Sequence, residues 1–170
     1  HRLVQFHAIA HSPSSPPKED SVPLASPPET GNLAADLLKV LCAILAGHTG
    51  TRDSCWFCLW NGYGWFHDSS TLHGQVVRLP NRSYFLFKGP LDAATELGWT
   101  MPGGSFIPQS PNLFWPQDHA WCVASEIDLF CTLVAASEAL AETIVNDPHL
   151  EAWRVFPGDP INRDSDKINT

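Results

Sequence analysis

The sequence predicts an α+β fold, with a mostly antiparallel sheet of about five to seven strands and two or three helices packed on it. One observation is a series of short apolar runs that alternate in polarity and are separated by Gly, Pro and Asn, which is typical of antiparallel strands. The other is that helical periodicity is confined to a few segments, chiefly 33–45 and 138–145. The 170 residues suit one domain with tails, at about 100–200 residues per domain.

Composition divides the chain into three parts. Residues 1–31 form a Pro/Ser-rich N-terminal arm or linker, because residues 12–31 hold six prolines and five serines. Residues 32–156 are predicted to form a single α+β domain, followed by a polar C-terminal tail, 157–170. Paired prolines in the arm favour polyproline II, which aromatic grooves can bind, but a plain linker is the simpler interpretation.

The charge of the chain is acidic and uneven. The formal net charge is −8, and residues 32–153 carry 5 basic and 12 acidic side chains, a difference of −7. Such a domain repels phosphate backbones, so no nucleic-acid partner is expected. No apolar run approaches the roughly 20 residues of a membrane span, and the first residues lack a signal-peptide pattern. No membrane association is therefore expected.

The cysteines indicate a reducing compartment. Their number is odd and each lies in an apolar run, which suits buried free thiols better than a disulfide framework. We therefore expect a cytoplasmic protein. The five residues are Cys42, Cys55, Cys58, Cys122 and Cys131.

A Cys-x-x-Cys spacing lies within the predicted strand 55–60. Residues three apart in a strand point to opposite faces, so Cys55 and Cys58 are not expected to face one metal ion. A zinc site completed by His67 and His73 is a weaker alternative. A redox motif is weaker again, because it requires the first cysteine at a helix N-terminus. No cofactor is expected.

The stretch 112–128 organises the predicted domain. Pro116 cannot donate to a sheet ladder, so a turn is expected over 116–119. The run 120–127 then alternates, with large apolar side chains on one face and small or acidic ones on the other. Together with the apolar run 129–135 it predicts a hairpin.

The acids of this stretch are the candidate catalytic residues. Glu126 is the candidate general base, with Asp128 or Asp118 as its partner. His119 is the candidate proton shuttle. In the competing interpretation, Glu126 is a buried acid held by one arginine and Asp128 is a turn residue.

Aromatic and cationic side chains are the candidate binding residues. The Asn-Gly pair at 61–62 is a strong hairpin cue, and the rings around it form either a recognition patch or a lid on the core. Two arginines flank a turn between predicted strands 76–79 and 83–87, and are the expected partners of the acids. The binding candidates are Trp60, Tyr63, Trp65, Arg78, Arg82, Trp115 and Trp121.

Local signals predict the remaining elements. Asn32 is the expected N-cap of the first helix, which Gly47 ends. A short helix is predicted over 90–97 because Pro90 suits a first helical turn. Residues 98–112 are predicted to be an irregular loop, rich in Gly and Pro, beside a cleft.

The C-terminal part of the domain is predicted to be a helix and a strand. Ser137 is the expected N-cap of the helix 138–145, and 150–156 is the expected last strand. The expected buried stripe of the helix is Leu140, Ile144 and Val145.

Three blocks of sequence carry a resemblance. The blocks 55–65, 79–90 and 112–128 resemble a group of actinobacterial proteins of unknown function, over about residues 33–156. This resemblance implies no activity or site residue. The order helix, strands, helix, strands is also loosely similar to SMI1/KNR4 (SUKH)-type immunity and scaffold domains, which implies an interaction function by fold analogy alone.

These observations favour a non-enzymatic protein-interaction module. An acidic surface with aromatic anchors suits a basic protein partner, and the sequence holds none of the common nucleophile, phosphate-loop or zinc-protease motifs. The alternative is a small hydrolase or transferase with a carboxylate site around Glu126 and Asp128. An unpaired edge strand also permits a homodimer.

Overall fold

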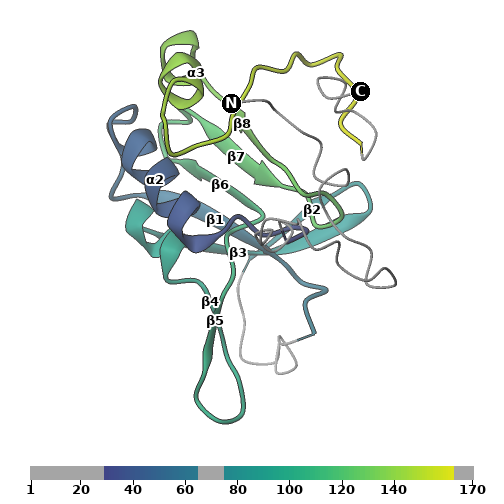
Figure 1. Ribbon diagram of the computed structural model, residues 1–170. Helices are drawn as coiled ribbons and strands as arrows, with labels where there is room; N and C mark the ends of the chain where they lie inside the picture. The colour runs from purple at the N-terminus through teal and green to yellow at the C-terminus, as the bar shows by residue number, and fades with distance from the viewer. Residues whose placement is uncertain (1–28, 65–74, 163–170) are drawn as a thin grey trace, which may run out of the picture. The chain divides into compact units, whose positions relative to one another are not determined.

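The computed structural model describes residues 29–64 and 75–162. Contacts divide these residues between two compact units, 29–154 and 155–162. The described residues of the unit 29–154 form two α-helices, a 3₁₀-helix and eight strands (Figure 1), which confirms the predicted α+β class. Within the described ranges, no helix is both long enough and apolar enough to cross a membrane.

Six antiparallel strands form the main sheet, in the order β2-β3-β1-β6-β7-β8 (Figure 1). Their bounds are β1 Cys55–Trp60, β2 Val76–Leu79, β3 Arg82–Gly89, β6 Leu113–Pro116, β7 Cys122–Ser125 and β8 Thr132–Ala135. The predicted hairpin in the organising stretch is confirmed as β7 and β8, and the predicted turn before it joins β6 to β7.

Strand β1 occupies the middle of this sheet and pairs with β3 and β6, which are distant in sequence. Its pairing with β3 runs from Cys55 to Trp60 and confirms the predicted strand. Trp65, which follows the Asn-Gly turn and is one of the predicted binding residues, lies outside the described residues.

Helix α2, Ala35–Ala46, ends at Gly47 as predicted, but the predicted N-cap is wrong. The N-cap is Ala34, which makes no side-chain cap hydrogen bond. Asn32 instead accepts a hydrogen bond through Oδ1 from the Ser110 N–H, at 2.8 Å. Its side chain therefore ties the start of the domain to the segment before β6.

The second α-helix, α3 Glu138–Val145, has the predicted N-cap. The Ser137 Oγ accepts a hydrogen bond from the Leu140 N–H at 3.4 Å. Leu140 and Ile144 are buried as predicted, whereas Val145 is 36% exposed and does not belong to the buried stripe.

Two other predictions of regular structure need correction. The segment predicted as the short helix is a 3₁₀-helix, η1 Leu91–Thr95. The predicted last strand 150–156 has no strand partner and is not a strand. Leu150 and Ala152 nevertheless pack against the core, so burial of these side chains produced the strand-like pattern.

The predicted loop 98–112 is largely a hairpin. Strand β4, Gly98–Thr100, pairs with β5, Phe106–Pro108, in a two-stranded sheet. Proline is tolerated because Pro102 lies in the turn and Pro108 ends its strand. The Gly/Pro composition therefore marked a hairpin turn rather than an unstructured segment.

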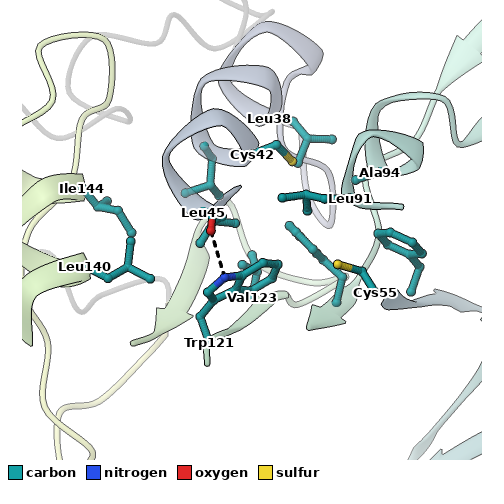
Figure 2. Packing of buried hydrophobic residues seen from close by; sticks show 13 residues of the cluster. Leu38, Cys42, Leu45, Cys55, Leu91, Ala94, Trp121, Val123, Leu140 and Ile144 are labelled. Atoms are coloured by element: carbon teal, nitrogen blue, oxygen red, sulfur yellow. Dashed lines mark hydrogen bonds between the residues drawn. The ribbon is translucent and has the colours of Figure 1, made fainter. Parts of the chain in front are cut away.

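One face of the main sheet carries the core (Figure 2). Helix α2 packs Leu38, Leu41 and Leu45 against this face, where Phe57 and Val123 are at most 1% exposed. The buried residues from η1 and α3 join the same cluster. Burying one such side chain contributes about 1.5–3 kcal/mol, so this inner face supplies most of the stabilisation of the domain.

Candidate functional site

The opposite, outer face of the sheet carries three tryptophans. Strand alternation places Trp56 and Trp60 of β1 on this face, and register places Trp115 of β6 directly opposite Trp56. All three are half-buried. The described helices contribute to the cluster on the inner face, so none of them covers these rings. We call Trp56, Trp60 and Trp115 the tryptophan face.

The indole of Trp56 is fixed by two polar neighbours. Its Nε1–H donates to the Gln117 Oε1 at 3.1 Å. The Lys88 Nζ lies 4.7 Å from the centre of the Trp56 ring, within range of a cation–π interaction. Trp56 therefore has a defined orientation at the surface.

Trp60 lies at the other end of β1, beside two other predicted binding residues. The Tyr63 ring meets the Trp60 ring edge to face, with centroids 5.4 Å apart. The Arg82 guanidinium lies 5.9 Å from the Trp60 ring centre. The structure thus brings together Trp60, Tyr63 and Arg82, whereas Trp65, predicted with them, lies outside the described residues.

Arg82 also joins two of the predicted catalytic acids. Its Nη2 lies 2.6 Å from the Asp128 Oδ2 and 3.5 Å from the Glu126 Oε1. The side chains of Glu126 and Asp128 are 43% and 71% exposed, so the interpretation of Glu126 as a buried acid is wrong, although its arginine partner was predicted. Exposed ion pairs contribute about 0–1 kcal/mol, and this one serves chiefly to orient Arg82 against Trp60.

The other two predicted catalytic residues lie at the opposite end of β7. Asp118 and His119 precede the strand, whereas Glu126 and Asp128 follow it, and the four residues of β7 span about 13 Å. Asp118 accepts hydrogen bonds from the Thr49 hydroxyl and the Gly50 N–H, each at 2.8 Å. The four candidates therefore do not converge on one site.

Asp118 links the end of α2 to the turn before β7. The hydrogen bonds that make this link also change the pKa of its carboxyl group. Burial acts to raise the pKa of Asp118, but hydrogen bonds from Thr49, Gly50, Ala120 and Thr51 outweigh it, and the net pKa lies below the ordinary 3.8. A lowered carboxyl pKa stabilises the folded state above the unfolded pKa, and this contribution disappears as pH falls through the folded value.

We expect Asp118→Asn to lower the free energy of unfolding at pH 7, with the deficit shrinking below about pH 4 as the wild-type carboxyl is protonated. Urea unfolding from pH 2.5 to 7 measures this difference. A deficit that stays constant over the whole range would show that the ionised carboxylate contributes nothing at this turn.

Two predicted binding residues lie elsewhere. Trp121 is 2% exposed and belongs to the core, where its Nε1–H donates to the Leu45 carbonyl at 3.2 Å (Figure 2). Its assignment to a binding surface is corrected accordingly. Arg78 is exposed on the edge strand β2, opposite Ser83 of β3.

The two cysteines of the Cys-x-x-Cys motif are fully buried on opposite faces of β1. Burial raises the pKa of Cys55 to about 11 and that of Cys58 to about 12, so neither is a thiolate at neutral pH. Among the described residues, no group of three or more ligating side chains could hold a metal ion. His67 and His73, the remaining zinc candidates, lie outside them.

A buried asparagine supports this end of the sheet and was not predicted. The Asn112 Oδ1 accepts from the Trp60 N–H at 2.8 Å, and its Nδ2 donates to the Tyr63 hydroxyl at 2.9 Å. Nδ2 also lies 3.3 Å from the Gly31 carbonyl. Burial raises the pKa of Tyr63, so its hydroxyl stays protonated. The available signal was one amide side chain inside an otherwise apolar run.

Gly31 completes this support. Its φ is +67°, and a Cβ there would lie 2.7 Å from the Ile127 Cα, closer than two carbons can pack. The Gly31 N–H donates to the Leu129 carbonyl at 3.0 Å. Only glycine suits this position, so the entry of the chain into the domain is fixed beside Trp60 and Tyr63.

A small hollow lies at the base of the β4–β5 hairpin. It holds about 10 Å³, which is room for one water molecule at most. The residues around it come from α2, η1 and the segment 108–110. It is too small for a substrate and therefore lends no support to catalysis.

Comparisons of the chain with protein-family models, curated protein sequences and solved structures found no match.

Proposed function

We propose that this protein is a non-enzymatic protein-interaction module, of immunity or scaffold type, which binds a protein partner through the tryptophan face. The observation that carries the proposal is the pairing of Trp56 with Trp115 on a sheet face that none of the described helices covers. Tryptophan and arginine dominate the energetically important residues of protein interfaces, and both gather on this face.

Orientation of the side chains before binding supports the proposal. Gln117 and Lys88 fix Trp56, and Arg82 lies against Trp60. A side chain that is already ordered loses less conformational entropy on binding. The surface therefore meets a basic requirement of a specific protein interface.

The charge distribution supports a basic partner. Residues 32–153 carry a net charge of −7, and Glu126 and Asp128 lie exposed beside Arg82, which contacts Trp60. Complementary charge raises the association rate and disfavours acidic competitors. We therefore propose a protein with a cationic surface, and neither nucleic acid nor membrane, as the partner.

The separation of the acids weakens the alternative function, a small hydrolase or transferase. Arg82 pairs with one oxygen each of Glu126 and Asp128, and Asp118 and His119 lie beyond the other end of β7. General acid–base catalysis needs groups within hydrogen-bond reach of one substrate. Binding without catalysis is the simpler use of this surface.

Two further parts of the proposal concern origin and compartment. A cytoplasmic location is supported by the five cysteines, all of which are free thiols. The kinship with SUKH-type domains or with actinobacterial proteins is supported by the order of elements and by the three sequence blocks alone.

The test is capture of the partner by the tagged full-length chain from native-host lysate at moderate salt, followed by calorimetry with the purified partner. We expect Trp115→Thr to weaken binding at least tenfold, because large interface residues cost more than about 1–2 kcal/mol when truncated. The control Trp153→Thr, at a tryptophan that is 49% exposed outside the sheet, is expected to bind normally.

Thermal unfolding of both variants establishes that they are folded. A stoichiometric partner that binds Trp115→Thr as tightly as the wild-type chain would contradict the proposal. Loss of binding in Glu126→Gln alone would show that the acids, and not the tryptophan face, dominate binding of the partner.

A further inference from the structure

The β4–β5 hairpin projects from the body of the 29–154 unit (Figure 1). Backbone hydrogen bonds extend its pairing beyond the strands, from Met101 N–H to the Ser105 carbonyl at 2.8 Å and from Gln109 N–H to the Leu97 carbonyl at 2.9 Å. The hairpin is therefore hydrogen-bonded along its whole length.

The hairpin exposes large apolar side chains, Met101 in its turn and Phe106 and Ile107 in β5. Met101 is 41%, Phe106 50% and Ile107 39% exposed. The Phe106 ring lies across Gly98, where a Cβ would approach it to 2.6 Å, and this contact holds the ring in place. Isolated two-stranded hairpins are marginal in water, so an apolar projecting one points to a bound state that covers it.

Charge is absent from this part of the sequence. From Leu97 to Gln117 the chain has no Asp, Glu, Lys, Arg or His, although 16% of the whole chain is charged. Asp92 and Glu96, just before the hairpin, are exposed acids. The hairpin is thus a neutral apolar projection with an acidic base.

The base of the hairpin is anchored to the core. On one side, Leu91 and Ala94 of η1 are buried against α2. On the other, the Ser110 Oγ accepts from the Leu33 N–H at 2.8 Å. The base of the hairpin is therefore fixed to the domain, which lowers the entropic cost of docking it.

These features decide what kind of surface fits. A lipid surface is disfavoured, because juxtamembrane segments that bind anionic lipids are basic, whereas the base here is acidic. A second copy is disfavoured because it would bring another acidic base, with its own Asp92 and Glu96, against the first, and like charges across an interface repel. A concave surface can enclose both faces of the hairpin.

We infer that the β4–β5 hairpin is a second docking element, which inserts Phe106, Ile107 and Met101 into an apolar groove of a protein partner whose rim is cationic. The inference rests on the proposed function for the existence of a protein partner. It adds a contact that the tryptophan face does not include.

Site-specific photocrosslinking in native-host cells tests this inference. The full-length chain carries p-benzoylphenylalanine at position 106, at position 115, or at position 143 of α3 as the control. We expect positions 106 and 115 to crosslink the same protein, and position 143 to crosslink none. The peptide crosslinked to position 106 is expected to line an apolar groove with Lys or Arg at its edge.

Calorimetry with the crosslinked protein measures how much the hairpin contributes to the binding affinity. We expect Phe106→Ser to weaken binding at least tenfold, whereas Val145→Ser, at another exposed apolar residue, leaves it unchanged. A crosslink at 115 without one at 106 would overturn the inference and leave the proposed function standing. Absence of a crosslink at both positions would contradict the inference and the proposed function together.

Two controls address the other surfaces. If the chain sediments with phosphatidylcholine vesicles and Phe106→Ser does not, the hairpin binds a lipid surface and not a protein groove. A dimer detected by light scattering, and lost in the same variant, would replace it by a second copy. Either result would overturn the inference.

Discussion

Replacing Asn112 with alanine is expected to lower the free energy of unfolding by about 1–3 kcal/mol, the cost of leaving a buried polar group such as the Trp60 N–H without its partner. Asn112 is 2% exposed. Its side chain bonds the Trp60 N–H and the Tyr63 hydroxyl, and Nδ2 also reaches the Gly31 carbonyl. Alanine removes these partners while the surrounding backbone remains buried. Urea unfolding followed by circular dichroism measures the loss.

Asn146→Ala is the matched control. Asn146 is exposed at the end of α3, and its side chain donates one hydrogen bond to the Glu142 carbonyl at 2.9 Å. Its replacement is expected to change the free energy of unfolding by about 0.5 kcal/mol or less, as at most surface sites. Equal losses in the two variants would show that the Asn112 contacts do not support the sheet.

Replacing Trp121 with alanine is expected to cost about 3–5 kcal/mol, the range for large aromatic side chains in a core. Trp121 packs edge to face on Phe114, with ring centroids 5.7 Å apart, and its indole N–H bonds Leu45 (Figure 2). Truncation leaves a cavity between α2 and the sheet. The midpoint and slope of denaturant unfolding report the change.

Trp153 provides the comparison for this variant. Its side chain is 49% exposed, so Trp153→Ala is expected to unfold close to the wild-type chain. Trp121→Phe keeps a ring but deletes the bond to Leu45, and we expect a loss between those of the two alanine variants. If Trp121→Ala were as mild as Trp153→Ala, the core would not be organised around this ring.

Alternating polarity predicted the parts of the fold that depend on neighbouring residues. It placed Cys55 and Cys58 on opposite faces of β1, and it placed Trp121 on the apolar face of the run 120–127, which agrees with its burial. The interpretation of Trp121 as a binding residue was wrong because an abundant, large aromatic residue suits both a core and an interface. Strand alternation was the better guide.

Pairing between distant strands limited the prediction of the candidate site. Alternation within β1 places Trp56 on the same face as Trp60, but its pairing with Trp115 depends on β6 lying beside β1. The role of Asn112 likewise depends on three segments that meet at its side chain. No local pattern contains this information, so Trp56 and Asn112 were not among the predicted site residues.

Short strands limited the prediction of the projecting hairpin. Each strand of the β4–β5 pair has three residues, fewer than the alternation pattern needs. The prediction therefore depended on the surrounding Gly and Pro residues, which are typical of a loop. The absence of charge from Leu97 to Gln117 was the available clue to the docking role that we propose for this segment.

Hydroxyl-radical footprinting of the full-length chain, free and in complex with its captured partner, is the most direct test of the tryptophan face. Mass spectrometry reports the oxidation of each tryptophan separately. We predict that complex formation protects Trp56, Trp60 and Trp115 and leaves Trp153 unchanged. Unchanged oxidation of the three tryptophans in a saturated complex would contradict the assignment of this face as the binding surface.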